Sequence, residues 1–83
     1  MQNEVWTAEG CGYCILAKKL LDEYNFKYVE INARDNKEAF KEKFPDATTV
    51  PQIIFHGQKV GGYTDLVEEF HNQNIFIGSQ SLG

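Results

Sequence analysis

The alternation of short strand-like and helix-like segments is the feature that most restricts what this chain can fold into. No internal repeat and no low-complexity tract interrupts it. A strand, a crossover helix and a second strand favour a right-handed parallel pair, whereas a hairpin adds antiparallel strands. We therefore predict an α/β fold in the order β-α-β-α-β-β-α, with one mixed four-stranded sheet flanked by helices. The expected strands cover 4–7, 27–32, 50–55 and 59–61, and the expected helices cover 12–24, 35–44 and 65–70.

The first helix is predicted from the spacing of its apolar residues. Leu16 and Leu20 lie four positions apart, as do Ala17 and Leu21, so they fall on neighbouring rows of a helix. Asn25 is a residue type that commonly ends a helix. We therefore expect this helix to end close to Asn25.

Turn and capping patterns predict where the later elements begin. Asp35 with Glu38, and Asp65 with Glu68, have the spacing of capping boxes, so we expect a helix to open at each pair. The dipeptide His56-Gly57 between two strand-like segments predicts a hairpin turn.

The size and composition of the chain indicate one small globular domain. Its 83 residues are 42% hydrophobic and 24% charged, which is enough apolar material for a core. We expect a single domain over 1–83, with its core in 1–74 and a C-terminal tail over 75–83. The formal net charge of −4 argues against nucleic acid binding, which needs a basic surface. No segment resembles a membrane span or a signal peptide, so we expect a cytoplasmic protein.

Both cysteines lie in one short stretch, GCGYC, at residues 10–14. A bond between Cys11 and Cys14 would close a loop too small to stabilise the fold strongly, so stapling explains the pair poorly. Cys-x-x-Cys between a first strand and a first helix is typical of dithiol redox motifs, because helix N-terminal N–H groups favour the attacking thiolate. Cys11 lies at that helix start, and Cys14 is close enough to resolve a mixed disulfide. Half of a zinc site and a purely structural pair are the alternatives at this point.

Three further stretches acquire meaning only together with the cysteine pair. Alone, Thr49-Val50-Pro51 reads as a strand entry, Gly61-Gly62 as a turn and Asp65 as a helix cap. Combined with C-x-Y-C and A-K-x-L-L, the segments T-V-P-Q-I and G-G-Y-T-D-L resemble the glutaredoxin family from about residue 3 to residue 71. The resemblance implies a thioredoxin-like fold, a cis peptide bond before Pro51, and glutathione as the reducing cosubstrate.

The resemblance also implies roles for individual residues. Cys11 would be the nucleophile and Cys14 the resolving thiol, while Tyr13 would flank bound glutathione. Val50 would offer its backbone N–H and C=O to the cysteinyl unit of glutathione, in the manner of strand addition. N–H groups at the start of the last helix would suit the γ-glutamyl carboxylate. The glutathione-binding set is completed by Thr64 and Asp65 at the γ-glutamyl end, and by Thr49, Pro51, Gly62 and Tyr63.

Two positions differ from the family pattern. Ala8 stands where many members have a cation that helps to hold the glycyl carboxylate or the thiolate, so Arg34 or a lysine would have to replace it. Gly12 stands in place of the usual proline of C-P-Y-C, which frees φ at that position. Some relatives without that proline resemble carriers of a [2Fe–2S] cluster that bridges two subunits with the help of glutathione.

By resemblance, the protein is a small glutathione-dependent oxidoreductase that reduces protein disulfides and protein–glutathione mixed disulfides. The expected partners are glutathione and disulfide-containing clients such as ribonucleotide reductase, with no nucleic acid and no membrane, and we expect a monomer. No tightly bound cofactor and no metal are expected, apart from a [2Fe–2S] cluster bridged through Cys11. The alternative functions are such a cluster carrier, and a redoxin recharged by thioredoxin reductase.

Overall fold

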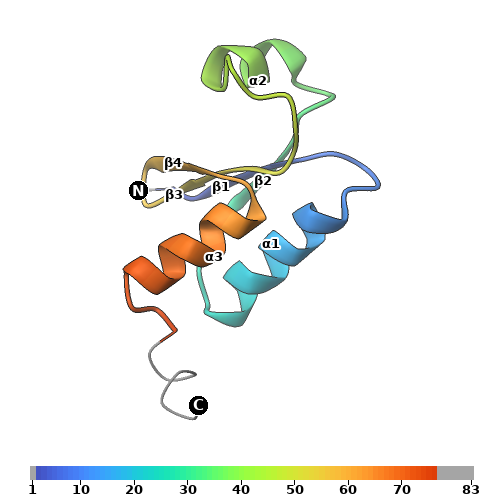
Figure 1. Ribbon diagram of the computed structural model, residues 1–83. Helices are drawn as coiled ribbons and strands as arrows, with labels where there is room; N and C mark the ends of the chain where they lie inside the picture. Colours follow the sequence, from blue (N-terminus) through green and yellow to red (C-terminus); the bar gives the residue numbers. More distant parts are fainter. Residues whose placement is uncertain (1, 77–83) are drawn as a thin grey trace.

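A computed structural model describes residues 2–76 of the protein. Within this range the helices and strands follow one another in the predicted order. They are β1 (Glu4–Thr7), α1 (Gly12–Glu23), β2 (Val29–Asn32), α2 (Lys37–Lys43), β3 (Gln52–Phe55), β4 (Gln58–Gly61) and α3 (Tyr63–Asn72). Figure 1 shows one sheet with α2 on one face and with α1 and α3 on the other.

The strands form one mixed sheet in the order β2-β1-β3-β4. β1 runs parallel to β2, with Val5 opposite Glu30, and antiparallel to β3, with Val5 opposite Ile53. β3 and β4 form an antiparallel hairpin whose turn residues His56 and Gly57 both have positive φ, 53° and 81°. Positive φ at both positions is the mark of a type I′ turn, which matches the twist of the adjoining strands. The predicted topology is therefore confirmed.

Side chains from the central strands alternate between two separate core clusters. Val5 and Ile53 face α1 and α3, whereas Trp6 and Ile54 face α2. We call these groups the α1/α3 cluster and the α2 cluster. The buried members of the α1/α3 cluster are Val5, Ala17, Leu20, Leu21, Ile53, Phe55, Leu66 and Phe70, and those of the α2 cluster are Trp6, Ala33, Phe44 and Ile54.

The end of α1 follows the prediction at Asn25. This residue has a left-handed φ of 62°, and its N–H donates to the Asp22 carbonyl at 3.1 Å. The N–H of Phe26 donates to the Leu21 carbonyl at 2.9 Å. Together these bonds form a Schellman motif, which satisfies carbonyl groups that the helix end would otherwise leave unpaired.

The predicted start of α2 at Asp35 is wrong. The N-cap of α2 is Asn36, whose side chain makes no capping bond. The carboxamide oxygen of Asn32 instead accepts the N–H groups of Arg34 and Asp35, at 2.9 and 3.1 Å. This Asx turn holds Asp35 in the loop that precedes the helix, so its carboxylate does not cap α2.

The chain after α3 packs back against the α1/α3 cluster. Ile75 and Phe76 are half-buried there, and the Phe76 ring lies 5.3 Å from Tyr24 and 5.4 Å from Phe70 between centroids. The first two residues of the expected tail thus contribute apolar contacts, while its other residues lie outside the described range. In residues 2–76 no helix has the length and apolar character needed to cross a bilayer.

Candidate active site

Cys11 lies where the chain turns from the β1–α1 loop into α1. It is the N-cap of the helix, and its Sγ accepts the N–H of Cys14 at 3.0 Å. Both this N–H group and the positive end of the helix dipole favour negative charge on the Cys11 sulfur. The fold therefore places residue 11 where a thiolate is stabilised when the pair is reduced.

A disulfide bond joins Cys11 to Cys14, so the structure shows the oxidised form of the pair. The two cysteines differ in access, because Cys14 is only 2% exposed whereas Cys11 is partly exposed. A sulfur atom from another molecule can approach Cys11 but not Cys14. This difference favours an order in which Cys11 attacks first and Cys14 acts second.

The loop before β3 brings a backbone carbonyl next to the cysteine pair. The carbonyl oxygen of Val50 lies 3.7 Å from the Sγ of Cys11. The peptide bond between Val50 and Pro51 is cis, as the resemblance implied, and Pro51 is buried. The backbone carbonyl group of Val50 therefore borders the reactive sulfur.

The start of α3 lies beside Pro51. Gly62 is its N-cap, and a Cβ atom on Gly62 would lie 3.7 Å from the Pro51 carbonyl oxygen. The Oδ2 of Asp65 accepts the Gly62 N–H at 3.0 Å, so Asp65 is the third residue of the helix. The capping box predicted at Asp65 and Glu68 is therefore wrong by three residues. Gly61 has a φ of 109°, and a Cβ there would lie 3.0 Å from the Asp65 Cγ, so the position requires glycine.

Two tyrosines connect the starts of α1 and α3. The rings of Tyr13 and Tyr63 are stacked, with centroids 6.1 Å apart and an interplanar angle of 24°. Tyr13 is 61% exposed, although its ring is large and mostly apolar. The two rings extend the site into an exposed aromatic surface on which a ligand can pack.

Two predicted site residues make no side-chain hydrogen bond within residues 2–76. Thr49 and Thr64 are both exposed. The backbone carbonyl of Thr49 accepts the side-chain amide of Gln52 at 3.0 Å, and Thr64 lies in the first turn of α3. Their assignment to glutathione binding stays a prediction.

Sequence reasoning missed a polar network beside the cysteines. A cavity of about 240 Å³ is lined by both cysteines and by Lys18, Glu30 and Thr7. The Lys18 Nζ donates to the Glu30 Oε2 at 2.9 Å, and the Thr7 hydroxyl donates to the same oxygen at 3.1 Å. The hydrogen bond from Lys18, followed by that from Thr7, holds the pKa of Glu30 below its usual 4.5, although burial acts in the opposite direction. No short sequence motif could reveal partners that lie 12 and 23 residues apart.

Gly12 is the first residue of α1, a position where proline is common. A Cβ atom on Gly12 would meet nothing within 4 Å, so the structure shows no steric need for glycine here. Within residues 2–76, no group of three or more His, Cys, Asp or Glu side chains is placed to hold a metal ion. A bridging [2Fe–2S] cluster would use only Cys11 from each of two chains, and it stays a prediction from the sequence.

Comparisons with known proteins agree with this geometry. The sequence model of the Glutaredoxin family matches residues 3–60. Glutaredoxin 1 of Rickettsia typhi is 44% identical over 66 residues, which cover 75% of this chain and 64% of that protein. Glutaredoxin 1 of Escherichia coli K12 is 38% identical over 74 residues, which cover 78% of this chain and 87% of that protein. The chain therefore spans less than two thirds of the Rickettsia protein but most of the Escherichia coli protein.

A solved structure extends the likeness to three dimensions. The crystal structure of a buckwheat glutaredoxin–glutathione complex superposes with a TM-score of 0.69 at 27% identity, over 92% of this chain and 73% of that one. The thioredoxin-like fold predicted from the sequence is thereby confirmed. Glutaredoxins are thiol–disulfide oxidoreductases, so this likeness favours the redox interpretation of Cys11 and Cys14 over the zinc and structural alternatives. Because the family model matches residues 3–60 and the Escherichia coli relative is 38% identical over most of its own length, the chain belongs to the glutaredoxin family.

Proposed function

We propose that the protein is a cytoplasmic, monomeric, glutathione-dependent oxidoreductase that reduces protein disulfides and protein–glutathione mixed disulfides. The observation that carries this proposal is the position of Cys11. Its sulfur accepts an N–H from the first turn of α1, is partly exposed, and is bonded to a buried second sulfur. A cytoplasmic location agrees with this chemistry, because glutathione keeps thiols reduced there.

The reaction begins with the reduced pair. The Cys11 thiolate attacks one sulfur of the client disulfide, forming a Cys11–client disulfide and releasing the other client sulfur as a thiolate. The Cys14 thiolate then attacks the Cys11 sulfur and releases the client as a dithiol, which leaves the Cys11–Cys14 bond seen in the structure. One glutathione thiolate opens this bond at Cys11, and a second glutathione releases the first as glutathione disulfide. Each turnover therefore transfers two electrons from two glutathiones to the client.

The surroundings of Cys11 support glutathione as the reductant. The Val50 carbonyl, 3.7 Å from the Cys11 sulfur, is placed to pair with the backbone of a cysteinyl residue bonded there. Asp65 uses Oδ2 for the Gly62 N–H, and its Oδ1 has no hydrogen-bond partner within residues 2–76, so it can accept the γ-glutamyl ammonium. The solved glutaredoxin–glutathione complex of buckwheat, which shares the fold, adds support.

The test is turnover of two substrates, with glutathione, glutathione reductase and NADPH as the reducing system. One substrate is a mixed disulfide between glutathione and a small thiol, and the other is a protein disulfide. Replacing Cys11 by Ser should reduce both activities to the uncatalysed rate. Replacing Cys14 by Ser should leave the first activity, because a second glutathione can release a mixed disulfide without Cys14. It should abolish the second activity, because there Cys14 releases the client protein from Cys11.

Two results would contradict the proposal. Equal loss of both activities in the two variants would reject the division of roles between Cys11 and Cys14. Full activity with thioredoxin reductase and NADPH, and none with glutathione, would reject glutathione as the reductant and favour the thioredoxin-reductase alternative.

A further inference from the structure

The polar network of Thr7, Lys18 and Glu30 has no part in the cycle above, although it lines the same cavity as Cys11 and Cys14. Its members come from three elements, because Thr7 ends β1, Glu30 lies in β2 and Lys18 lies in α1. Cys14 is only 2% exposed, so charges in this cavity act on its sulfur with little screening by salt and bulk water. The network is therefore placed to change the reactivity of the second sulfur.

The proposed cycle puts negative charge on the Cys14 sulfur twice. When glutathione attacks Cys11, the Cys14 sulfur leaves as a thiolate with the electron pair of the broken bond. When a client is released, Cys14 attacks Cys11 as a thiolate. Burial opposes this charge, because a buried thiolate loses the water that would solvate it. A fixed positive charge nearby would offset that loss.

Lys18 can supply this positive charge. It lies four positions after Cys14 on α1, so the two side chains share one face of the helix. Side chains on a helix lean towards its N-terminus, which for Lys18 is the direction of Cys14. A lysine ammonium has three N–H groups, and Glu30 accepts one of them at 2.9 Å. The other two have no hydrogen-bond partner within residues 2–76, so they can donate to a thiolate.

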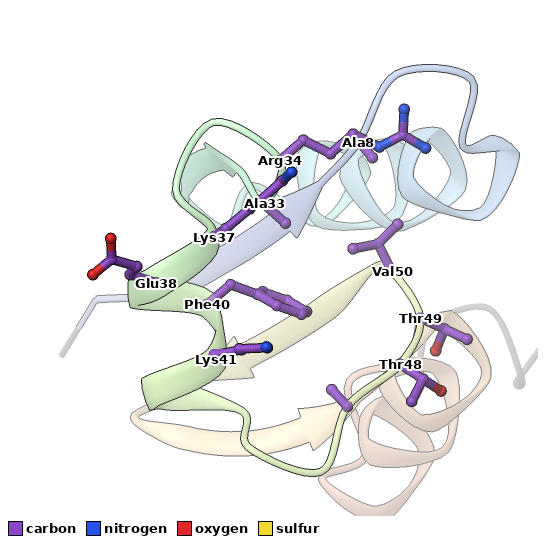
Figure 2. A pocket seen from close by; sticks show the side chains of 11 residues that line it. Ala8, Ala33, Arg34, Lys37, Glu38, Phe40, Lys41, Thr48, Thr49 and Val50 are labelled. Carbon is purple, nitrogen blue, oxygen red and sulfur yellow. The ribbon is translucent and has the colours of Figure 1, made fainter.

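The other charged groups near the cavity do not supply a competing cation. Besides the cysteines, the titratable residues that line it are Lys18, Glu9 and Glu30. Glu9 is exposed in the loop before α1, so water screens its charge. Three further cations line a separate groove beside α2 (Figure 2), namely Arg34, Lys37 and Lys41. Lys18 is therefore the one cation among the described residues that line the cysteine cavity.

Glu30 acts on Lys18 rather than on the sulfur. Its Oε2 accepts both the Lys18 ammonium and the Thr7 hydroxyl, so the ammonium is held beside β2. The pKa of Glu30 lies below its usual 4.5, so this carboxylate is a poor base for a thiol, whose ordinary pKa is about 8.5. Glu30 is thus a positioning residue for Lys18.

We propose that the Lys18 ammonium, held by Glu30 and Thr7, stabilises the Cys14 thiolate each time the Cys11–Cys14 bond opens or closes. The inference rests on the proposed function and adds to it a residue that acts on the second sulfur. The bonds made and broken are those of the cycle above, and Lys18 keeps its proton throughout.

One reaction can follow the two sulfurs separately. Reduced protein is mixed with excess glutathione disulfide and quenched with acid at increasing times, and mass spectrometry separates the Cys11–glutathione adduct from the Cys11–Cys14 disulfide. Formation of the adduct reports attack by Cys11 on glutathione disulfide, which releases one glutathione. Decay of the adduct reports attack by Cys14 on Cys11, which releases the second. Opening of the bond by glutathione is the reverse of this decay, so the same charge serves both directions.

Lys18→Gln should slow the decay about threefold and leave the formation unchanged. Loss of a neighbouring positive charge should lower the thiolate fraction of Cys14 about tenfold at pH 7, the low end of the usual range, because Glu30 offsets part of that charge. The less stabilised thiolate is a better nucleophile by about threefold, which returns part of the loss.

Three further variants show whether the charge is responsible. Lys18→Arg keeps the positive charge, so the adduct should decay at close to the unmodified rate. Lys19→Gln removes the charge of an exposed neighbour outside the cavity, and it should change neither step. Glu30→Gln keeps an oxygen that can accept the Lys18 N–H but removes the negative charge, so the decay should be unchanged or faster.

Each contrary outcome has a distinct meaning. Unchanged decay in Lys18→Gln, or equal slowing in Lys18→Arg, would overturn the inference and leave the proposed function intact. Equal slowing of formation and decay would overturn it as well, because the lysine would then act on Cys11 or on the whole fold. Slower decay in Glu30→Gln would overturn it by making the carboxylate the base for Cys14. Failure of the unmodified protein to form any adduct would overturn both the inference and the proposed function.

Discussion

The helices on the two faces of the sheet bury their side chains to different extents. On one face, α1 and α3 bury side chains of their own, and Leu21 and Phe70 are both 0% exposed. On the other face, no residue within α2 is buried, since Phe40 is half-buried and Phe44 is the C-cap that follows the helix. The comparison shows that α1 and α3, which carry Cys14 and Asp65, bury side chains of their own, whereas α2 covers the other face of the sheet without burying any.

The deep packing of the α1/α3 face agrees with the proposed disulfide exchange. Disulfide exchange requires Cys11, Cys14 and the ligand-binding backbone to keep fixed positions, because displacements near 1 Å affect reactivity strongly. We therefore expect mutations on the α1/α3 face to affect global stability, and mutations on the α2 face to act more locally.

The largest effect is expected from a pair of matched phenylalanine substitutions. Phe70→Ala removes a ring that is 0% exposed and leaves a cavity, so it should lower the free energy of unfolding by about 3–5 kcal/mol. Phe40→Ala removes a half-buried ring and should cost about 1–2 kcal/mol. Urea denaturation of the oxidised proteins, followed by circular dichroism, measures both. Equal losses would show that the two faces are packed to the same depth and would refute the comparison.

An intermediate effect is expected where α2 is tied to the sheet by polar groups. Glu4, on β1, accepts the Trp6 indole N–H at 2.8 Å and pairs with Lys43 at 3.2 Å. Glu4→Ala would leave the Nε1–H of a ring that is only 4% exposed without its acceptor, at a cost of about 1–3 kcal/mol. Amide hydrogen exchange should accelerate most in α2. Glu4→Gln is the control, because its amide oxygen can still accept the Trp6 N–H while the charge that pairs with Lys43 is gone. An equal loss of unfolding free energy in both variants would assign the effect to the ion pair alone.

The parts of the fold that sequence could predict are those decided by local chemistry. The helical spacing from Leu16 to Leu21 and the left-handed Asn25 fixed the extent of α1, and His56-Gly57 fixed the hairpin turn. The predicted starts of α2 and α3 are wrong because an acidic residue followed three positions later by Glu does not cap either helix. Asx-turn bonding by Asn32 and the glycine N-cap at Gly62 decide these starts instead.

The candidate site divides in the same way. Cys11, Cys14 and Pro51 could be predicted because each belongs to a short motif with its own chemical meaning. The ion pair of Lys18 with Glu30 could not be predicted, because Lys18 on α1 and Glu30 on β2 come close only once β1 and β2 have paired in parallel. A groove of about 470 Å³ between α2 and residues 47–50 could not be predicted either, because nothing in the sequence around Lys37 or Lys41 indicates that α2 lies opposite those residues.

The smallest effect is expected from the ion pair on the deep face, because packing already anchors α1 there. Glu30→Gln removes the charge that pairs with Lys18, at a side chain that is 46% exposed. After allowance for solvent screening, it should lower the free energy of unfolding at pH 7 by only about 0.2–0.5 kcal/mol. The folded-state pKa of Glu30 lies below 4.5, so the charged form contributes stability above that pH and loses it as the pH falls through the folded pKa. The difference between the two proteins in urea denaturation should therefore shrink towards zero below pH 4.5, whereas the cost of Phe70→Ala should persist there. If Glu30→Gln cost more at pH 7 than Glu4→Ala, α1 would depend on its ion pair more than α2 does, and the proposed difference in anchoring between the two faces would be reversed.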